Sequence, residues 1–279
     1  MNRHSKATPI SNWHIIREQI KYVDLLIEVC DARAPFSSRH PKTKEIFVNK
    51  PTLLVLNKAD LADKKLLLES VNQFSQSAYE KALPLSLKTK TNKQGVLHLI
   101  KSLTEAKRVA SIKRGINIPV TRICVIGMPN VGKSSLINWL CGRRQAKVGD
   151  KPGITRGPQW IKIGLGLELL DTPGILPREN LDKKTVEKLA ILNLITGSPI
   201  DEESLANEIL NFLSASYPTA IKEYLHAEDM KVENISLEAL AKKRNFLSSG
   251  GKYNLQRAAN TLISDVRCGK LGGIFLDKV

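Results

Sequence analysis

The order of two short motifs constrains the fold of this chain more than any other feature. Residues 127–134, GMPNVGKS, fit the pattern GxxxxGK[ST], in which backbone amides at a helix N-terminus cradle phosphates and the lysine neutralises their charge. The tetrad Asn57-Lys58-Ala59-Asp60, which is suited to reading a purine base, lies about seventy residues earlier. In ordinary domains with both motifs the phosphate loop comes first. The reversed order therefore predicts a circular permutation.

Short apolar runs rich in branched side chains alternate with helix-like patterns in the first part of the chain. The runs that we predict to be strands are Val23–Cys30, Thr52–Asn57, Ala82–Leu87, Val120–Ile126, Gln159–Ile163 and Leu167–Leu170. This alternation predicts an α/β fold with a doubly wound, mostly parallel sheet. Such sheets bind ligands beyond the carboxyl ends of their strands, and both Asn57 and Gly127 stand at such ends.

From Glu179 onward the strand pattern stops and helical periodicity replaces it. The periodicity is clearest at Leu255, Ala258, Ala259, Leu262, Ile263 and Val266. Gly269 follows this helix as its expected C-cap. We therefore predict two domains, a permuted nucleotide-binding domain over residues 1–178 and a smaller all-helical domain over residues 179–279. A further helix-like pattern begins near Ser11.

The positive charge of the chain is spread unevenly. The net charge is +16, and residues 1–178 carry 30 basic and 13 acidic side chains against 13 and 14 in residues 179–279. A large basic excess favours a polyanionic partner, although a solvated basic face is the alternative. Aromatic residues make up 5% of the chain and do not alternate with the basic runs. This argues against a stacking platform for single strands and favours the phosphates of folded RNA, with no DNA partner expected.

The helical part is itself divided by charge. Residues 179–241 hold 5 basic and 12 acidic side chains, whereas residues 242–279 hold 8 and 2. We expect one face of this domain to contact RNA and another to face solvent or protein.

Hydropathy and cysteine usage bear on the compartment. No stretch approaches the roughly 18 apolar residues that span a bilayer, and no hydrophobic signal core follows the N-terminus. This favours a cytoplasmic protein without membrane contact, although the first seventeen residues contain no acid, as in some organellar targeting segments. Four cysteines, Cys30, Cys124, Cys141 and Cys268, lack paired CxxC spacing, and we expect buried, reduced thiols.

The phosphate loop carries the first set of candidate residues. Lys133 is placed to bridge the outer phosphates, the Ser134 hydroxyl to coordinate Mg²⁺, and Ser135 to lie near the inner phosphates. The amides of Val131 and Gly132 belong to the same cradle.

Two later segments supply further phosphate and metal contacts. Asp171 follows an apolar strand, where its carboxylate can hold Mg²⁺ through water, and Gly174 can offer an amide to the γ-phosphate. Thr155 lies between the phosphate loop and Asp171 in a basic loop rich in Pro and Gly. It is the candidate second hydroxyl ligand of Mg²⁺, although a turn residue is the simpler interpretation of a threonine in such a loop.

The tetrad supplies the contacts to the base. Asp60 can accept two hydrogen bonds from the ring N–H and exocyclic amine of guanine, which adenine does not offer in that arrangement. Asn57 can contact the opposite edge, and the stem of Lys58 can pack across the ring. Ser86-Leu87-Lys88 ends the next predicted strand, where a backbone amide can read the guanine carbonyl. Together these segments favour GTP over ATP.

With these motifs the chain resembles the circularly permuted GTPases, and within them the bacterial ribosome biogenesis GTPase A group, from Val23 to the C-terminus. Further segments that resemble this group are Asp31-Ala32-Arg33, Asn57 to Asp63, Gly153-Ile154-Thr155, Gln159-Trp160, Tyr217-Pro218 and Ser248-Ser249-Gly250-Gly251. The resemblance implies a GTPase that is slow alone and stimulated by the ribosome, binds rRNA on the immature large ribosomal subunit and leaves after hydrolysis. A GTP-gated RNA-binding placeholder with little hydrolysis, or a GTPase that acts on another RNA such as tRNA, are the alternatives.

The catalytic apparatus departs from simpler GTPases. Ile175 stands where many of them place a glutamine that orients the attacking water. Asn130 resembles the asparagine that coordinates K⁺ in cation-dependent GTPases, although a loop asparagine that caps its own turn is the alternative. The candidate catalytic residues are therefore Lys133, Thr155 and Asn130. Because the helical domain follows directly after Asp171 to Ile175, a γ-phosphate-dependent movement there is expected to reach its helices.

Other candidates carry less weight. The Trp-Phe-Pro-Gly-His-Met segment found near the N-terminus of family members is missing, and Thr8-Pro9 lies near its place. His4 and His14 are nearby, but a lone histidine on a helical pattern is more simply structural. Arg33 and Arg156 can each reach phosphate or RNA, or serve as surface salt-bridge partners, and neither enters the catalytic set.

Overall fold

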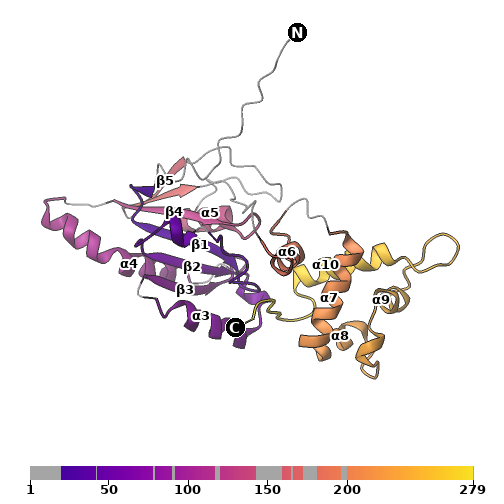
Figure 1. Cartoon of the computed structure of the whole chain (residues 1–279). Coiled ribbons are helices and arrows are strands. Elements are labelled where there is room, and N and C mark those ends of the chain that lie inside the picture. Colours follow the sequence, from indigo (N-terminus) through magenta and orange to yellow (C-terminus); the bar gives the residue numbers. More distant parts are fainter. Residues whose placement is uncertain are drawn as a thin grey trace, which may run out of the picture.

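The computed structural model describes residues 20–41, 43–77, 79–89, 92–116, 120–142, 159–164, 166–171, 181–195 and 200–278. A sheet flanked by helices forms one lobe, and a group of helices forms the other (Figure 1). The predicted α/β fold followed by a helical part is confirmed. The predicted helix near Ser11 and the predicted boundary at residues 178 and 179 lie outside the described residues.

The six strands found among the described residues run in the order β3-β2-β1-β4-β6-β5 across one sheet. They are β1 (Leu25–Asp31), β2 (Thr52–Asn57), β3 (Glu80–Leu85), β4 (Thr121–Gly127), β5 (Gln159–Gly164) and β6 (Leu167–Asp171). Of these described strands, β5 alone runs antiparallel, to its neighbour β6. Every residue of β1 and β2 is buried, as expected for central parallel strands covered on both faces. The predicted mostly parallel, doubly wound sheet is confirmed.

The register of the strands brings their carboxyl ends to one edge of the sheet. Asp31 of β1 pairs with Asn57 of β2, and Gly127 of β4 lies beside β1 at Val29. β3 begins and ends two residues earlier than the predicted strand Ala82–Leu87, because its pairing with β2 places Leu85 beside Asn57. Residues 86–88 therefore form a turn just beyond the strand.

Alternate strand residues face two different layers of helices. The helices of this lobe are α2 (Thr43–Ile46), η1 (Ala59–Leu61), α3 (Lys64–Phe74), α4 (Lys93–Lys113) and α5 (Lys133–Cys141). Ile27 and Val29 belong to one hydrophobic cluster with Ile100 of α4 and Leu136 of α5. Cys30, Leu54 and Leu56 pack instead with Leu67 and Phe74 of α3. This period of two assigns α4 and α5 to one face and α3 to the other.

The second lobe consists of short helices around an apolar centre. Its elements are α6 (Lys183–Ile191), α7 (Glu202–Ser216), α8 (Pro218–Leu225), η2 (Val232–Asn234), α9 (Leu237–Lys243) and α10 (Leu255–Cys268). α10 packs against α7 and α9 and buries most of the predicted apolar stripe, whereas Leu255 at its start is half-buried. Gly269 adopts a left-handed φ of 81° after α10, which confirms the predicted C-cap.

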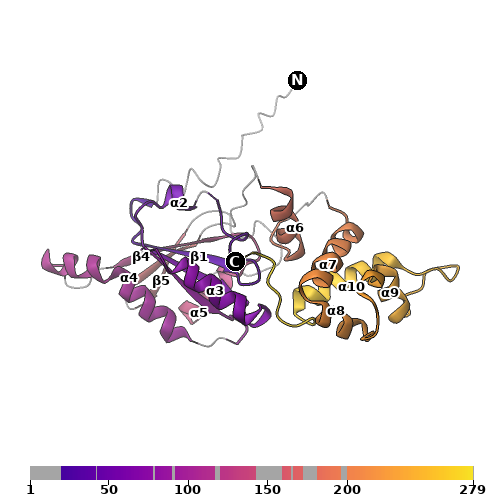
Figure 2. The same ribbon diagram turned by 60° about the horizontal axis from the view of Figure 1, so that its bottom comes forward.

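The last residues of the described chain return to the sheet lobe (Figures 1 and 2). Ile274 donates its amide to the Leu61 carbonyl at 3.2 Å, and Leu276 donates to the Arg33 carbonyl at 2.7 Å. Phe275 is buried in the same cluster as Leu56. The C-terminal segment therefore packs directly beside the tetrad, an arrangement that the helical pattern of residues 179–279 did not predict.

Two of the four cysteines differ from the prediction. Cys30 and Cys124 are buried in β1 and β4, and burial raises the pKa of the Cys124 thiol to about 12. Cys141 is only half-buried and Cys268 is exposed. The prediction of four buried thiols is wrong for this pair, because each ends its helix, where the apolar stripe gives way to solvent. No described helix is long and apolar enough to cross a membrane.

Candidate nucleotide-binding site

The phosphate loop joins the end of β4 to the start of α5 and depends on glycine at both ends. Gly127 has a φ of 151°, and a Cβ there would lie 2.4 Å from the Val29 carbonyl oxygen. Gly132 is the N-cap of α5 with a φ of 107°, and no side chain caps this helix. The first amides of α5 are therefore oriented toward an external acceptor, as in anion sites at helix N-termini.

Lys133 lies folded over this loop. Its side chain is buried, and Nζ donates to the Met128 carbonyl at 2.8 Å. Ser134 and Ser135 follow it in the first turn of α5 and are half-buried. The three side chains predicted to meet phosphates and Mg²⁺ thus start from one helical turn at the carboxyl edge of the sheet.

Asn57 connects three segments that are far apart in the sequence. Its Nδ2 donates to the Val131 carbonyl in the phosphate loop at 2.7 Å, and its Oδ1 accepts from the Leu87 amide at 3.2 Å. Beside it, the Ser86 hydroxyl oxygen is buried and has no hydrogen-bond partner among the described residues. Buried polar atoms normally have partners, so a ligand atom fits there. The tetrad, the phosphate loop and residues 86–88 therefore form one site.

Gly132→Ala is expected to weaken nucleotide binding by more than the backbone strain of an alanine at this position would alone. An added Cβ would lie 2.4 Å from Asn57 Nδ2, so the mutation combines a left-handed φ, which costs about 1–2 kcal/mol, with loss of the Asn57 contact. Gly250→Ala is the matched control, because Gly250 has a φ of 83° and nothing within 4 Å of the added Cβ. The unfolding temperature should fall in both variants, whereas nucleotide affinity should fall only in Gly132→Ala. Equal affinity in the two variants would contradict the link through Asn57.

The rest of the tetrad lies just beyond β2. Lys58 has a left-handed φ of 61°, and its Nζ lies 2.8 Å from Asp31 Oδ2. Asp60 is exposed in η1, and Lys88 is exposed beyond β3. The Asp60 carboxylate is therefore accessible to a ligand, while the Lys58 ammonium is held against the Asp31 carboxylate of β1.

Arg33 is buried, which fits neither of the two roles left open by the sequence, contact with phosphate or RNA and a surface salt bridge. Its guanidinium is buried and makes two hydrogen bonds of 2.9 Å to the carboxylate of Asp31. Burial alone would raise the pKa of Asp31, but the hydrogen bonds and charges of Arg33 and Lys58 hold it below its usual value. Both interpretations assumed an exposed side chain, because an arginine in a loop is exposed far more often than it is buried.

The structure covers the metal and catalytic candidates only in part. Asp171 ends β6 and pairs with Val125 of β4, so its backbone lies at the same sheet edge as the phosphate loop. Asn130 donates from Nδ2 to the Asn193 carbonyl at 2.8 Å, a contact across to α6 that neither sequence-based interpretation included. The candidates that lie outside the described residues are Thr155, Gly174, Ile175, Arg156, His4 and His14.

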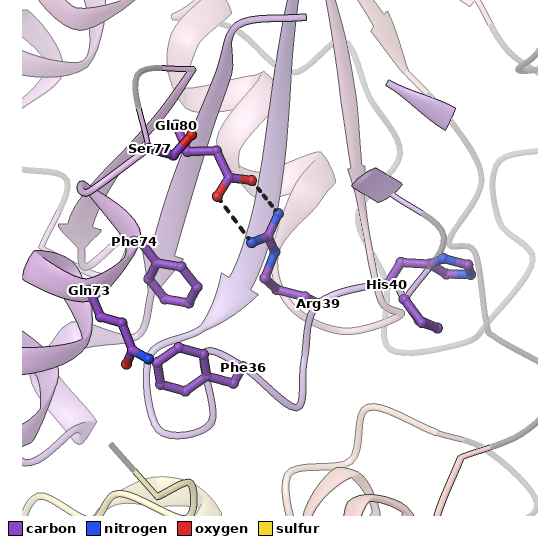
Figure 3. Close-up of a pocket in the computed structure, with 8 residues that line it drawn as sticks. Phe36, Arg39, His40, Gln73, Phe74, Ser77 and Glu80 are labelled. Carbon is purple, nitrogen blue, oxygen red and sulfur yellow. Dashed lines mark hydrogen bonds and ion pairs between the residues drawn. The ribbon is translucent and has the colours of Figure 1, made fainter. Parts of the chain in front are cut away.

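A hollow lined by none of the predicted site residues lies between the loop after β1 and α3 (Figure 3). It has a volume of about 470 Å³ and is lined in part by Phe36, His40 and Phe74. Arg39 crosses it, with Nε 2.9 Å from Glu28 and Nη2 2.8 Å from Glu80. These ion pairs neutralise the Arg39 charge and link the loop after β1 to β1 and β3, so we assign Arg39 a structural role.

Comparison with known proteins decides between the classes of nucleotide-binding protein. A family profile described as "50S ribosome-binding GTPase" matches residues 122–239. Ribosome biogenesis GTPase A of Bacillus pumilus is 36% identical over 264 residues, which cover 94% of this chain and 93% of that protein. The chain belongs to the ribosome biogenesis GTPase A family. The Bacillus cereus member is 35% identical over 258 residues, covering 92% of this chain and 87% of its own.

The solved structures agree with the family assignment. The GDP-bound structure of YlqF shares 25% sequence identity with a TM-score of 0.65, and the alignment covers 94% of this chain and 98% of that one. The predicted GTPase resemblance is therefore confirmed. As a member of the ribosome biogenesis GTPase A family the chain is a GTP-hydrolysing enzyme, and the site at the carboxyl edge of its sheet is where its motifs converge.

Proposed function

We propose that this GTPase binds rRNA on the immature large ribosomal subunit in its GTP-bound form and is released after hydrolysis. The single observation that carries the nucleotide part is the position of Asn57, which hydrogen-bonds both the phosphate loop and the segment after β3. The names of the relatives point to the ribosome. The basic surfaces of the chain support RNA as the component that it contacts.

In this proposal the site residues divide the work between base and phosphates. Asp60 and the Ser86-Leu87-Lys88 turn read guanine, and Asn57 and Lys58 support them. The amides of Asn130 to Ser135 surround the phosphates, and the Gly174 amide meets the γ-phosphate. In the transition state most of the negative charge lies on the γ-phosphoryl oxygens, and the positive charge of Lys133 offsets it.

Mg²⁺ fits the donor set of this site. Serine and threonine hydroxyls, a carboxylate and phosphate oxygens are the hard ligands that Mg²⁺ prefers. We assign Ser134, Thr155 and Asp171 to it, and the pairing of Asp171 with Val125 supports this by placing the strand end beside the loop. When bound, the ion draws charge from the β- and γ-phosphate oxygens.

Potassium is the proposed second cation. The Asn130 side-chain nitrogen donates to the Asn193 carbonyl, and this contact orients the Asn130 side-chain oxygen in the other direction. That oxygen is the proposed K⁺ ligand, and the ion would take the part that an arginine finger has in other GTPases.

Two basic surfaces support contact with RNA. Both carboxylates in residues 242–279 are engaged internally, since Asp265 accepts from Tyr224 and Asp277 from the amide of Phe36. This leaves exposed cations at Lys242, Lys243, Arg244, Lys252 and Arg257. α4 extends past the sheet (Figure 1), and with its C-cap it exposes Lys101, Lys113 and Arg114. Such clusters bind phosphates through charge and counterion release.

GTP hydrolysis should be slow for the protein alone and rise by at least about tenfold with immature large subunits in K⁺ buffer. The triple variant Lys242→Glu/Lys243→Glu/Arg244→Glu should keep the basal rate, because α9 lies on the side of the helical lobe away from the sheet (Figures 1 and 2), and it should lose most of the stimulation. Single-turnover assays with and without subunits, in K⁺ and in Na⁺, measure both effects. Subunit binding without stimulation of hydrolysis would indicate a placeholder. Stimulation by tRNA but not by large subunits would indicate another RNA target. Equal hydrolysis rates in K⁺ and Na⁺ would contradict the K⁺ assignment.

A further inference from the structure

The buried Arg33 bonds the tetrad side of the site to the helical lobe. On one side it holds Asp31, which in turn holds the Lys58 ammonium at 2.8 Å. On the other side its Nη1 lies 3.2 Å from the Arg267 carbonyl and 3.4 Å from the Val266 carbonyl. Both carbonyls lie in the last turn of α10, where backbone carbonyls lack donors within the helix, and the Val266 carbonyl also accepts from the Gly269 amide at 3.2 Å. One guanidinium therefore connects a member of the tetrad to the end of a helix more than two hundred residues away.

A second guanidinium continues the connection to α6. Arg267 stands in the last turn of α10 and donates from Nε to the Ile191 carbonyl and from Nη2 to the Ala190 carbonyl, both at 2.8 Å. Burial lowers the pKa of Arg267, and the positive charge of Arg33 lowers it further, as expected for two cations in proximity. Helix C-termini carry partial negative charge, so both guanidiniums are favourably placed.

The last contact in this series joins the segment after α6 to the phosphate loop. Asn193, with a left-handed φ of 58°, follows α6 and accepts from Asn130 at 2.8 Å. The C-terminal segment supports the same corner, where Asp277 accepts from Lys188 of α6 at 2.8 Å. The ends of α6 and α10 are thus bonded to both halves of the nucleotide site, by Asn130 on the phosphate side and by Lys58 through Asp31 on the base side.

We infer that Arg33 is a positioning residue for guanine-nucleotide binding, and that the Asp31–Arg33 pair couples occupancy of the site to docking of the helical lobe through the ends of α10 and α6. Nucleotide that orders Lys58 and the phosphate loop favours the docked helices, and docked helices favour nucleotide, because such coupling is reciprocal. This route is distinct from the segment after Asp171. The inference rests on the proposed nucleotide site.

Arg33→Lys tests the role of the guanidinium. Lysine keeps the charge but lacks the fork that reaches Asp31 and the α10 carbonyls together. We expect GDP to bind about tenfold more weakly, the loss typical of one charge-assisted hydrogen bond. In the wild-type chain GDP should slow amide hydrogen exchange at residues 189–194 and 264–270, and this protection should disappear in the variant.

The matched control is Arg108→Lys. Arg108 makes a similar two-bond contact to Glu105, with both bonds at 2.9 Å, but on the exposed face of α4. It should leave GDP affinity and protection unchanged. Arg267→Lys, which removes the contact to α6 without touching Asp31, should lose protection at residues 189–194, and it decides the question if Arg33→Lys does not fold.

A lower unfolding temperature in Arg33→Lys with unchanged GDP affinity and unchanged protection would overturn the inference, since a merely structural role predicts that pattern. Failure of the wild-type chain to bind GDP would instead contradict the proposed function. The two failures are therefore distinguishable in the same titration.

Discussion

Asp60→Asn is expected to move the base preference of this GTPase from guanine to xanthine. The Asp60 carboxylate is exposed in η1, just beyond β2, and in our assignment it accepts two hydrogen bonds from guanine. Asparagine keeps one acceptor and replaces the other with a donor that faces the exocyclic amine of guanine. Loss of one charge-assisted bond and an unpaired donor should cost about 2–4 kcal/mol of GTP affinity, or roughly 30- to 1,000-fold.

Xanthine carries a carbonyl where guanine carries that amine, so the asparagine amide regains a partner. XTP should therefore bind Asp60→Asn better than it binds the wild-type chain. Competition titrations with GTP, XTP and ATP against a fluorescent nucleotide measure the change. The control is Asp63→Asn, three residues further along, where the carboxylate caps α3 by accepting from the Lys65 and Leu66 amides. That variant should lose about 1 kcal/mol of stability or less and keep its preference for GTP.

An unchanged order of nucleotides in Asp60→Asn would show that the base is read elsewhere, and the assignment of the tetrad would fail. An equal loss of affinity for GTP, XTP and ATP would indicate that the mutation disrupts η1 rather than recognition of the base.

The sequence predicted the sheet and the location of the nucleotide site because both depend on local patterns. β2 was predicted to the residue, since its apolar run is bounded by Pro51 and by the tetrad itself. The phosphate loop was predicted from its motif spacing between an apolar strand and a helix, and the spacing is informative because glycine is required where a Cβ would meet the Val29 carbonyl. Contacts between residues that are close in the sequence produce local sequence patterns that can be recognised.

The connections between lobes were not predictable in the same way. Arg33 belongs to a segment that resembles the family and Arg267 to a predicted helix, but nothing in their neighbourhood shows that each ends against a helix terminus. The return of Phe275 to the α3 face of the sheet likewise pairs residues that are about two hundred positions apart. Such long-range contacts depend on how the two lobes dock, which hydrophobic periodicity does not encode.

Lys133→Met should nearly abolish GTP hydrolysis while leaving the fold intact. The Lys133 side chain is buried over the phosphate loop and bonds the Met128 carbonyl, so methionine of similar length fills the space but removes the positive charge. A preorganised charge at the developing phosphate contributes about 3–4 kcal/mol, which predicts a rate loss of roughly 10²- to 10³-fold.

The fall should appear in single-turnover hydrolysis at saturating GTP, and it should persist with large ribosomal subunits present. Lys183→Met is the matched control, because that lysine is exposed on α6 and makes only a 3.7 Å pair with Glu187; its rate should equal that of the wild-type chain. If Lys133→Met kept its rate, the phosphate charge would have to be offset by another cation, and Asn130 with a bound K⁺ would become the first candidate. A rate loss in Lys133→Met that K⁺ does not rescue would instead place the main electrostatic contribution on Lys133.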